Sequence, residues 1–318
     1  MKKKNIVLLS TGVLATLSVG ALGFVGNYFY NLALNPKTSK DIIFGKPEES
    51  EDTIGEVVNE DVNWLTSNSN FSDEYITSFD NLKLHGYKIL NENSTNKWVI
   101  TVHGYTCEGS DMNLYARKFY DMGYNVLIPD LRAHGNSEGS YIGMGWNDRL
   151  DIIEWINLII KNYENTEIIL HGVSMGAATV SMVSGENLPN NVKAIIADCG
   201  YTSVWNQFSH KLKGLYSLPD FPVMHASSLV SKFRAGYNLR KASALNQVSK
   251  SKTPILFIHG DKDDFVPYLM MDELYTATSS EKEKLTIEGA GHAKASKVNP
   301  ELYWSTIETF TNKYVDLN

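Results

Sequence analysis

A serine flanked by glycines is the first residue in the sequence that could do chemistry. The five residues GVSMG, centred on Ser174, fit the Gly-x-Ser-x-Gly pattern, in which a serine at a sharp strand-to-helix turn presents its hydroxyl to a carbonyl carbon. A predicted apolar strand at 168–171 precedes this stretch, and a predicted small-residue helix at 177–184 follows it. A helix-capping serine is the alternative, but the strand–turn–helix order favours Ser174 as a nucleophile.

A serine hydroxyl needs a general base, and the base needs an acid that orients it. In folds with this kind of turn, the chain order is serine, then acid, then histidine. Three aspartates follow a later apolar strand in the stretch HGDKDDFVP: Asp261, Asp263 and Asp264. The stretch GAGHA then places His292 in a glycine-rich loop. Histidine suits the role of base because its pKa lies near neutral pH.

Short apolar segments alternate with amphipathic ones along the chain. After a hairpin of 74–79 and 82–90, buried strands are predicted at 98–103, 125–130, 168–171, 192–197, 255–259 and 284–287. Helices are predicted at 111–122, 147–163, 177–184, 268–278 and 300–314. This alternation indicates an α/β fold with a mainly parallel sheet flanked by helices. In such sheets the chemistry gathers at the carboxyl ends of the strands.

Residues 201–252 interrupt this alternation. They contain two prolines, many aromatic residues and no convincing strand, so we predict an inserted cap of helices. The cap has eight basic residues and one acidic residue, in a chain with a net charge of −7. The basic surplus predicts a solvated face, a contact with anionic material such as lipid headgroups or an acidic acyl substrate, or docking of the acidic segment 41–80.

The N-terminus predicts a membrane segment. Lysines at positions 2–4 precede a mostly apolar run at 6–26, close to the roughly 20 residues that span a bilayer. Tyr28, Phe29 and Tyr30 follow, where an interfacial aromatic belt belongs. We therefore expect residues 1–34 to form a single-pass transmembrane signal anchor in the cell membrane, with the catalytic domain outside the cytoplasm. A cleaved signal peptide, which would give a secreted protein, is the alternative.

Composition narrows the function further. A net charge of −7 and a pI near 5.6 argue against nucleic-acid binding. The two cysteines, Cys107 and Cys199, form no Cys-x-x-Cys pair, which disfavours thiol-based zinc or redox chemistry. Four His-Gly pairs, at positions 103, 134, 171 and 259, raise the question of a metal cluster. No carboxylate at a ligand spacing supports a metal, so we expect neither a metal nor a cofactor.

Five stretches, taken in their order along the chain, resemble the α/β-hydrolase superfamily, within it the serine esterase and acyl-peptidase-like branch. They are VITVHGY, PDLRAHGNSEG, LHGVSMGAAT, HGDKDDFVP and GAGHA. The resemblance covers about residue 74 to the C-terminus. In the family's pattern the catalytic acid is the aspartate of Asp-x-x-Val-Pro, which is Asp263 here, with Asp264 as the runner-up. The resemblance also implies that the backbone N–H of Tyr105 joins that of Met175 as an oxyanion donor.

Three parts are therefore expected along the chain: the anchor at 1–34, an acidic tether at 35–70, and an α/β-hydrolase domain at 71–318 that carries the cap. The expected activity is that of a carboxylesterase-like serine hydrolase, which cleaves a small-molecule acyl ester through an acyl-enzyme. Ser174 is expected to attack, His292 to act as base and Asp263 to orient it. A peptidase or thioesterase with the same triad, and a non-catalytic surface-binding protein on this scaffold, are the alternatives.

One further motif is expected to have a structural role. Asp130, Arg132 and Asn136, in the stretch PDLRAHGNSEG, are expected to hold the loop that follows their strand. The catalytic set is already full without these three residues.

Overall fold

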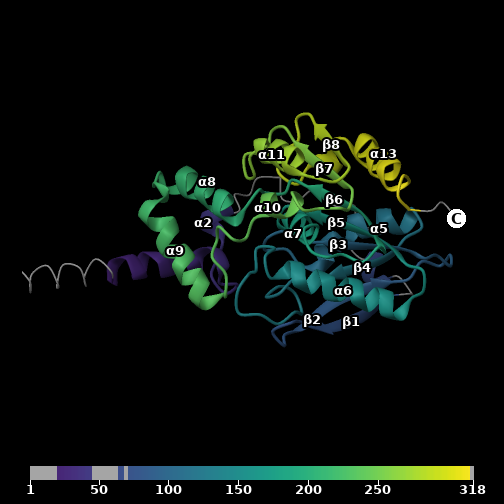
Figure 1. Ribbon diagram of the computed structural model, residues 1–318, viewed down its shortest axis with the longest axis horizontal. Helices are drawn as coiled ribbons and strands as arrows, with labels where there is room; N and C mark the ends of the chain where they lie inside the picture. Colours follow the sequence, from purple (N-terminus) through teal and green to yellow (C-terminus); the bar gives the residue numbers. More distant parts are fainter. Residues whose placement is uncertain (1–19, 45–63, 68–70, 316–318) are drawn as a thin grey trace, which may run out of the picture.

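The computed structural model describes residues 20–44, 64–67 and 71–315, and within these ranges one mixed sheet forms the centre of the protein (Figure 1). The strand order is β1-β2-β4-β3-β5-β6-β7-β8. β1 and β2 pair antiparallel, β2 pairs antiparallel with β4, and all later neighbours are parallel. The strands are β1 (Phe71–Thr77), β2 (Lys83–Ile89), β3 (Lys97–Val102), β4 (Asn125–Pro129), β5 (Glu167–Val173), β6 (Val192–Asp198), β7 (Ile255–Gly260) and β8 (Lys282–Ile287).

Helices cover both faces of this sheet because successive strand residues point to opposite sides. On β3, Trp98 belongs to one core cluster and Val99 to the other. The Val99 side packs against α5 (Asn113–Asp121) and α13 (Pro300–Thr311). The Trp98 side packs against α6 (Asp148–Asn162), α7 (Met175–Val183) and α11 (Leu269–Ala277). The prediction of an α/β fold with a mainly parallel sheet flanked by helices is confirmed.

The predicted boundaries of the strands and helices agree with the structure to within three residues. The helix predicted at 111–122 is α5, and a separate 3-10 turn, η1 (Gly109–Met112), precedes it. A second short helix, α12 (Ala295–Val298), lies between β8 and α13 and was not predicted. Helices of about four residues contain too little periodicity to be recognised in a sequence.

The segment between β6 and β7 forms three helices: α8 (Val204–Tyr216), α9 (Asp220–Arg234) and α10 (Ala244–Val248). Figure 1 shows α8 and α9 beyond one end of the sheet, whereas α10 packs against α7 and α11. A helix over residues 20–34 lies alongside α9. The two helices approach closely at Gly26, where an added Cβ would lie 2.7 Å from backbone atoms of Ala226. Only glycine allows this spacing.

The described residues give no support to the predicted membrane anchor. Within residues 20–44, 64–67 and 71–315, no helix combines the length and apolarity that crossing a bilayer requires. Most of the predicted span, residues 6–19, lies outside the described residues. Phe29 and Tyr30, which were expected in an interfacial belt, instead pack against the protein, and Tyr30 is only 3% exposed.

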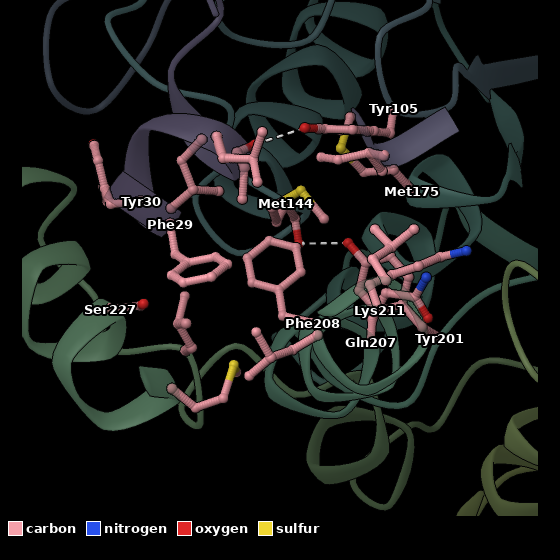
Figure 2. Close-up of a pocket in the computed structure, with 18 of the residues that line it drawn as sticks. Phe29, Tyr30, Tyr105, Met144, Met175, Tyr201, Gln207, Phe208, Lys211 and Ser227 are labelled. Carbon is pink, nitrogen blue, oxygen red and sulfur yellow. Dashed lines mark hydrogen bonds between the residues drawn. The ribbon is translucent and has the colours of Figure 1, made fainter. Parts of the chain in front are cut away.

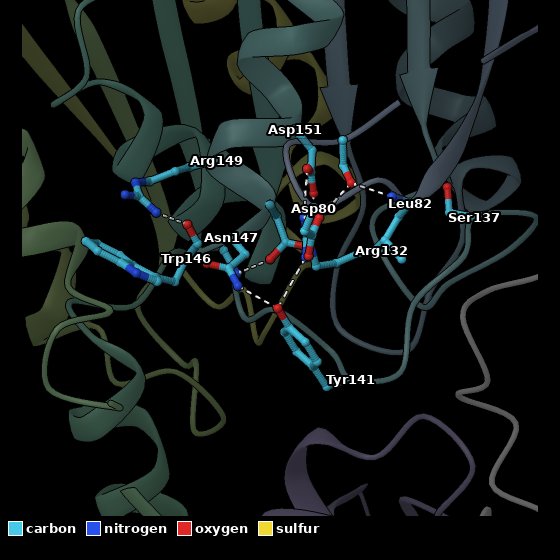
Figure 3. A network of polar contacts seen from close by, with 12 residues as sticks. Asp80, Leu82, Arg132, Ser137, Tyr141, Trp146, Asn147, Arg149 and Asp151 are labelled. Atoms are coloured by element: carbon cyan, nitrogen blue, oxygen red, sulfur yellow. Dashed lines mark hydrogen bonds and ion pairs between the residues drawn. The ribbon is translucent and has the colours of Figure 1, made fainter. Parts of the chain in front are cut away.

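The loop after β4 is held by buried ionic contacts, as expected for this motif. Arg132 is fully buried and binds Asp151 through two hydrogen bonds of 2.8 Å, and it also reaches Asp80 at 3.0 Å (Figure 3). Burial alone would lower the pKa of Arg132, but the two carboxylates outweigh that effect and raise it. Asp130 accepts hydrogen bonds from the backbone N–H of Asn136, at 2.9 Å, and from that of Gly109.

Replacing Arg132 tests whether this network stabilises the fold. We expect Arg132→Met to lower the free energy of unfolding by about 3–5 kcal/mol, because it leaves buried carboxylates without a counterion. Arg240→Met is the matched control, since Arg240 is exposed and lies over the ring of Trp205, a contact worth about 0.5–1 kcal/mol. Urea unfolding of both variants provides the measurement. Equal losses in the two would contradict a stabilising role for the buried network.

Candidate active site

Ser174 lies in a strained turn between β5 and α7. Its backbone has φ 57° and ψ −114°, a conformation that costs free energy in a residue other than glycine. The two flanking glycines make the turn possible. An added Cβ at Gly172 would lie 2.3 Å from the backbone of Gly176, and one at Gly176 would lie 2.0 Å from the carbonyl oxygen of Val102. The turn therefore packs directly against the end of β3.

The structure brings the three predicted catalytic side chains together in one hydrogen-bonded line. His292 Nε2 lies 2.8 Å from Ser174 Oγ, and His292 Nδ1 lies 2.7 Å from Asp263 Oδ2. The three residues come from the loops after β5, β7 and β8, which are parallel neighbours or next neighbours in the sheet. This geometry permits proton transfer from the serine hydroxyl to the imidazole.

The structure distinguishes between the three candidate aspartates. Among them, within the described residues, only Asp263 forms a hydrogen bond with His292. Asp261 instead accepts a hydrogen bond of 2.6 Å from the backbone N–H of Gly289, and Asp264 is exposed. Asp263, which the superfamily resemblance indicated as the catalytic acid, is therefore the aspartate that contacts the His292 imidazole.

Several donors hold Asp263 in place. Its Oδ1 accepts the backbone N–H groups of Phe265, at 2.9 Å, and Val266, at 2.8 Å. Its Oδ2 lies 3.0 Å from His259 Nε2 as well as close to His292. Burial alone would raise the pKa of Asp263, but the hydrogen bonds from His259 and His292 outweigh it and hold the pKa well below its usual range. The carboxylate therefore stays ionised and can stabilise a protonated His292.

The two predicted oxyanion donors lie beside the serine. Met175 is the first residue of α7, where backbone N–H groups point away from the helix and favour negative charge. The loop that carries Tyr105 passes close by, since a Cβ added at Gly104 would lie 3.6 Å from Ser174 Cβ. Within the described chain, neither N–H donates to a backbone oxygen outside its own secondary structure.

Ser174 lines an apolar pocket, and Figure 2 shows this pocket from close by. Its walls come from the loop after β3, from the cap helices α8 and α9, from Phe265 and Val266, and from the N-terminal segment. Tyr105 lines it too, and donates a hydrogen bond of 2.7 Å from its hydroxyl to the carbonyl of Ala33. Such a pocket suits the apolar part of an acyl substrate.

The histidines of the His-Gly pairs have structural partners. His103 Nδ1 lies 2.8 Å from its neighbour's carbonyl, and its Nε2 accepts the backbone N–H of Leu131. Thr101 Oγ1 lies 2.8 Å from His171 Nδ1. Burial lowers the pKa of both His103 and His171 to about 3, so both are neutral. Among the described residues, the one cluster with metal-ligand spacing is Cys199, Asp263 and His292, which includes two members of the triad.

The basic residues of the cap have several kinds of partner. Arg234 donates to the side chains of Asn27, at 2.9 Å, and Asn31, at 3.0 Å, in the N-terminal helix. Lys211 is half-buried, lines the pocket, and lies over the ring of Phe265; desolvation lowers its pKa. Lys213 and Lys232 are exposed. Contact of the cap with anionic material stays a prediction, and most of the acidic segment 41–80 lies outside the described residues.

Two residues at the site were not predicted from the sequence. His259 was noted only as one of four His-Gly pairs, yet it contacts the carboxylate of Asp263. Phe265 was not singled out, yet its ring lies 4.8 Å from that of His292. A signal existed for Phe265, because it lies within the HGDKDDFVP stretch that carries the catalytic acid.

Comparisons with known proteins agree with the observed fold. The family described as serine aminopeptidase, S33, matches residues 93–232. The Bacillus subtilis protein YqkD is 29% identical over 321 residues, covering 99% of each chain. The Arabidopsis thaliana alpha/beta hydrolase domain-containing protein WAV2 is 25% identical over 200 residues, covering 60% of this chain and 61% of its own.

A solved structure has the same fold. The Pyrococcus furiosus esterase Pf2001 superposes with a TM-score of 0.65 and 26% identity, covering 82% of this chain and 96% of its own. The chain has the α/β-hydrolase fold, and these matches support the α/β-hydrolase superfamily. In this α/β hydrolase, Ser174 occupies the turn where the fold presents a nucleophile.

The glycines around the nucleophile generate a stability prediction. We expect Gly176→Ala to destabilise this α/β hydrolase by at least about 3 kcal/mol, the upper end of overpacking costs, because its Cβ would overlap the backbone of Val102. Gly214→Ala in α8 is the matched control, since nothing lies within 4 Å of its added Cβ. That substitution should stabilise the helix by about 0.5 kcal/mol. Thermal unfolding compares the two; an unchanged midpoint for Gly176→Ala would contradict the close packing.

Proposed function

We propose that this protein is a serine hydrolase that cleaves acyl esters through a covalent acyl-enzyme. The observation that carries the proposal is the hydrogen-bonded line from Ser174 through His292 to Asp263, placed at the end of an apolar pocket. A serine that only caps a helix does not require an imidazole 2.8 Å from its hydroxyl. It also does not require an ionised carboxylate, with four donors of its own, on the far side of that imidazole.

The proposed reaction begins with attack by Ser174 Oγ on the acyl carbonyl carbon, while His292 Nε2 takes the hydroxyl proton. Asp263 accepts from His292 Nδ1–H, which orients the ring and stabilises the imidazolium that forms. The carbonyl oxygen becomes an oxyanion, which the N–H groups of Met175 and Tyr105 stabilise. Collapse of this intermediate expels the alcohol, which receives the proton from His292.

The second half of the reaction releases the acyl group. A water molecule gives its proton to His292 and attacks the carbonyl carbon of the acyl-enzyme. The new tetrahedral intermediate uses the same two backbone donors. It then collapses to the free acid, and Ser174 Oγ recovers its proton from His292. The products are the free acid and the alcohol, the enzyme returns to its starting state, and no step of this reaction uses a cofactor.

An ester is the favoured substrate, and a peptide or thioester is the alternative. The apolar pocket supports an acyl chain, and the superposed Pyrococcus furiosus protein is an esterase. The matching family is described as serine aminopeptidase, which keeps a peptide bond as the second candidate, because fold and triad do not select the leaving group. A panel of p-nitrophenyl esters, thioesters and peptide anilides separates these three substrate classes.

Active-site labelling tests the proposed nucleophile. We expect a fluorophosphonate probe to label the wild-type protein and Ser181→Ala, but not Ser174→Ala. Ser181 is the matched control because it is a buried serine in α7, the helix that Ser174 precedes, and its hydroxyl has no hydrogen-bond partner among the described residues. Hydrolysis of p-nitrophenyl butyrate should fall by about 10³-fold or more in Ser174→Ala alone. Absence of labelling in folded wild-type protein would instead favour a non-catalytic binding protein.

A further inference from the structure

The N-terminal segment forms one wall of the pocket that leads to Ser174. Six of its residues line the pocket, together with residues from the cap and the sheet loops: Phe29, Tyr30, Leu32, Ala33, Leu34 and Ile43. Figure 2 shows Phe29 and Tyr30 on one side and Phe208 and Lys211 of α8 on another. From the sequence alone, residues 1–34 were expected to contact lipid as a membrane anchor, and residues 35–70 were expected to form an acidic tether.

This wall is attached to the cap along its length. Phe29 packs edge to face on Tyr216 of α8, with ring centroids 5.3 Å apart. The guanidinium of Arg234 lies 4.4 Å from the ring centroid of Tyr30. Together with the close approach of Gly26 to α9, these contacts hold the helix against α8 and α9.

The other end of the wall is attached to the catalytic machinery. The hydroxyl of Tyr105, whose N–H is a proposed oxyanion donor, binds the carbonyl of Ala33 at 2.7 Å. The backbone N–H of Ile142 donates to the carbonyl of Leu34 at 2.8 Å. After the helix, α2 (Asp41–Phe44) places the ring of Phe44 parallel to that of Phe265, 5.2 Å away. The ring of Phe265 in turn contacts the ring of His292.

Apolar side chains on both sides limit the room in this pocket. Phe29 of the N-terminal helix and Phe208 of α8 both line it. A longer chain needs more room, and the N-terminal helix is the one wall that does not belong to the α/β-hydrolase domain itself.

We propose that the N-terminal segment, through residues 29–34 and 43, is a specificity-determining part of the acyl site and limits the chain length that the enzyme accepts. The substrate class that follows is an ester of an apolar acyl group. This inference rests on the proposed ester hydrolysis. It concerns which acyl chain is accepted, whereas the triad concerns whether any ester is cleaved.

Paired substitutions in the N-terminal helix test this role. We expect Phe29→Ala to raise the ratio of kcat/KM for p-nitrophenyl octanoate over butyrate by about tenfold, since one methylene in an apolar pocket is worth about 10–200-fold. Ala33→Leu should lower the same ratio by narrowing the pocket. Phe208→Ala, on the opposite wall, should raise it as Phe29→Ala does. Phe24→Ala is the matched control, because Phe24 lies on the same helix, is 75% exposed and does not line the pocket.

The outcomes separate this inference from the proposed function. A ratio that stays within twofold of wild type in Phe29→Ala and Ala33→Leu, while Phe208→Ala changes it, would overturn the role of the N-terminal wall. An equal change in Phe24→Ala and Phe29→Ala would also overturn it, because the effect would then come from a loosened helix. Loss of Ser174 labelling and of all ester hydrolysis in the wild-type protein would instead refute the hydrolase proposal. If Phe29→Ala does not fold, Ala33→Leu alone decides.

Discussion

The site depends on a close contact between the backbones of α7 and β3, which leaves no room for a side chain at Gly176. Gly176, at the start of α7, lies so close to the end of β3 that an added Cβ would be 2.0 Å from the carbonyl oxygen of Val102. This contact brings the helix start against the sheet and forces Ser174 into a positive φ between them. The strained serine backbone persists because the surrounding packing allows no relaxed alternative. The same contact sets the direction of the Ser174 hydroxyl and the position of the Met175 N–H.

The remaining groups reach Ser174 because parallel strands end along the same edge of the sheet. β7 leads directly into the loop of Asp263, and β8 leads into the loop of His292, so two neighbouring strands supply the acid and the base. The loop after β3 brings Tyr105 from the other side. Buried neutral histidines at strand ends, such as His103, fix these loops through hydrogen bonds to backbone groups. The site is thus assembled from loops that meet at one edge of the sheet.

Much of this arrangement could be predicted from the sequence, because its signals are local. Each strand is a short apolar run, and Ser174 and His292 each lie in a short motif next to such a run. Asp263 could be distinguished from Asp261 and Asp264 by family resemblance alone, because the choice depends on loop geometry around the backbone N–H groups of Phe265 and Val266. The contact of His259 with Asp263 is likewise invisible in the sequence.

The N-terminal segment shows the opposite case. An apolar helix has the same composition whether its partner is lipid or protein, so hydrophobicity predicted a membrane span and an aromatic belt. The structure instead shows Phe29 and Tyr30 against the cap and the pocket. Small features decide the packing: a glycine at position 26 that admits α9, and two asparagines that Arg234 can reach. Neither feature predicts this packing unless the position of α9 is already known.

The central claim is that Ser174 carries the acyl group during the reaction, and trapping the intermediate tests it most directly. Wild-type protein can be mixed with p-nitrophenyl butyrate, quenched in acid within milliseconds, digested and examined by mass spectrometry. The account predicts one butyryl group on the peptide that contains Ser174, at a level that rises before the steady state. Continued turnover with no acyl group on that peptide, or with the group on another residue such as Cys107, would contradict it.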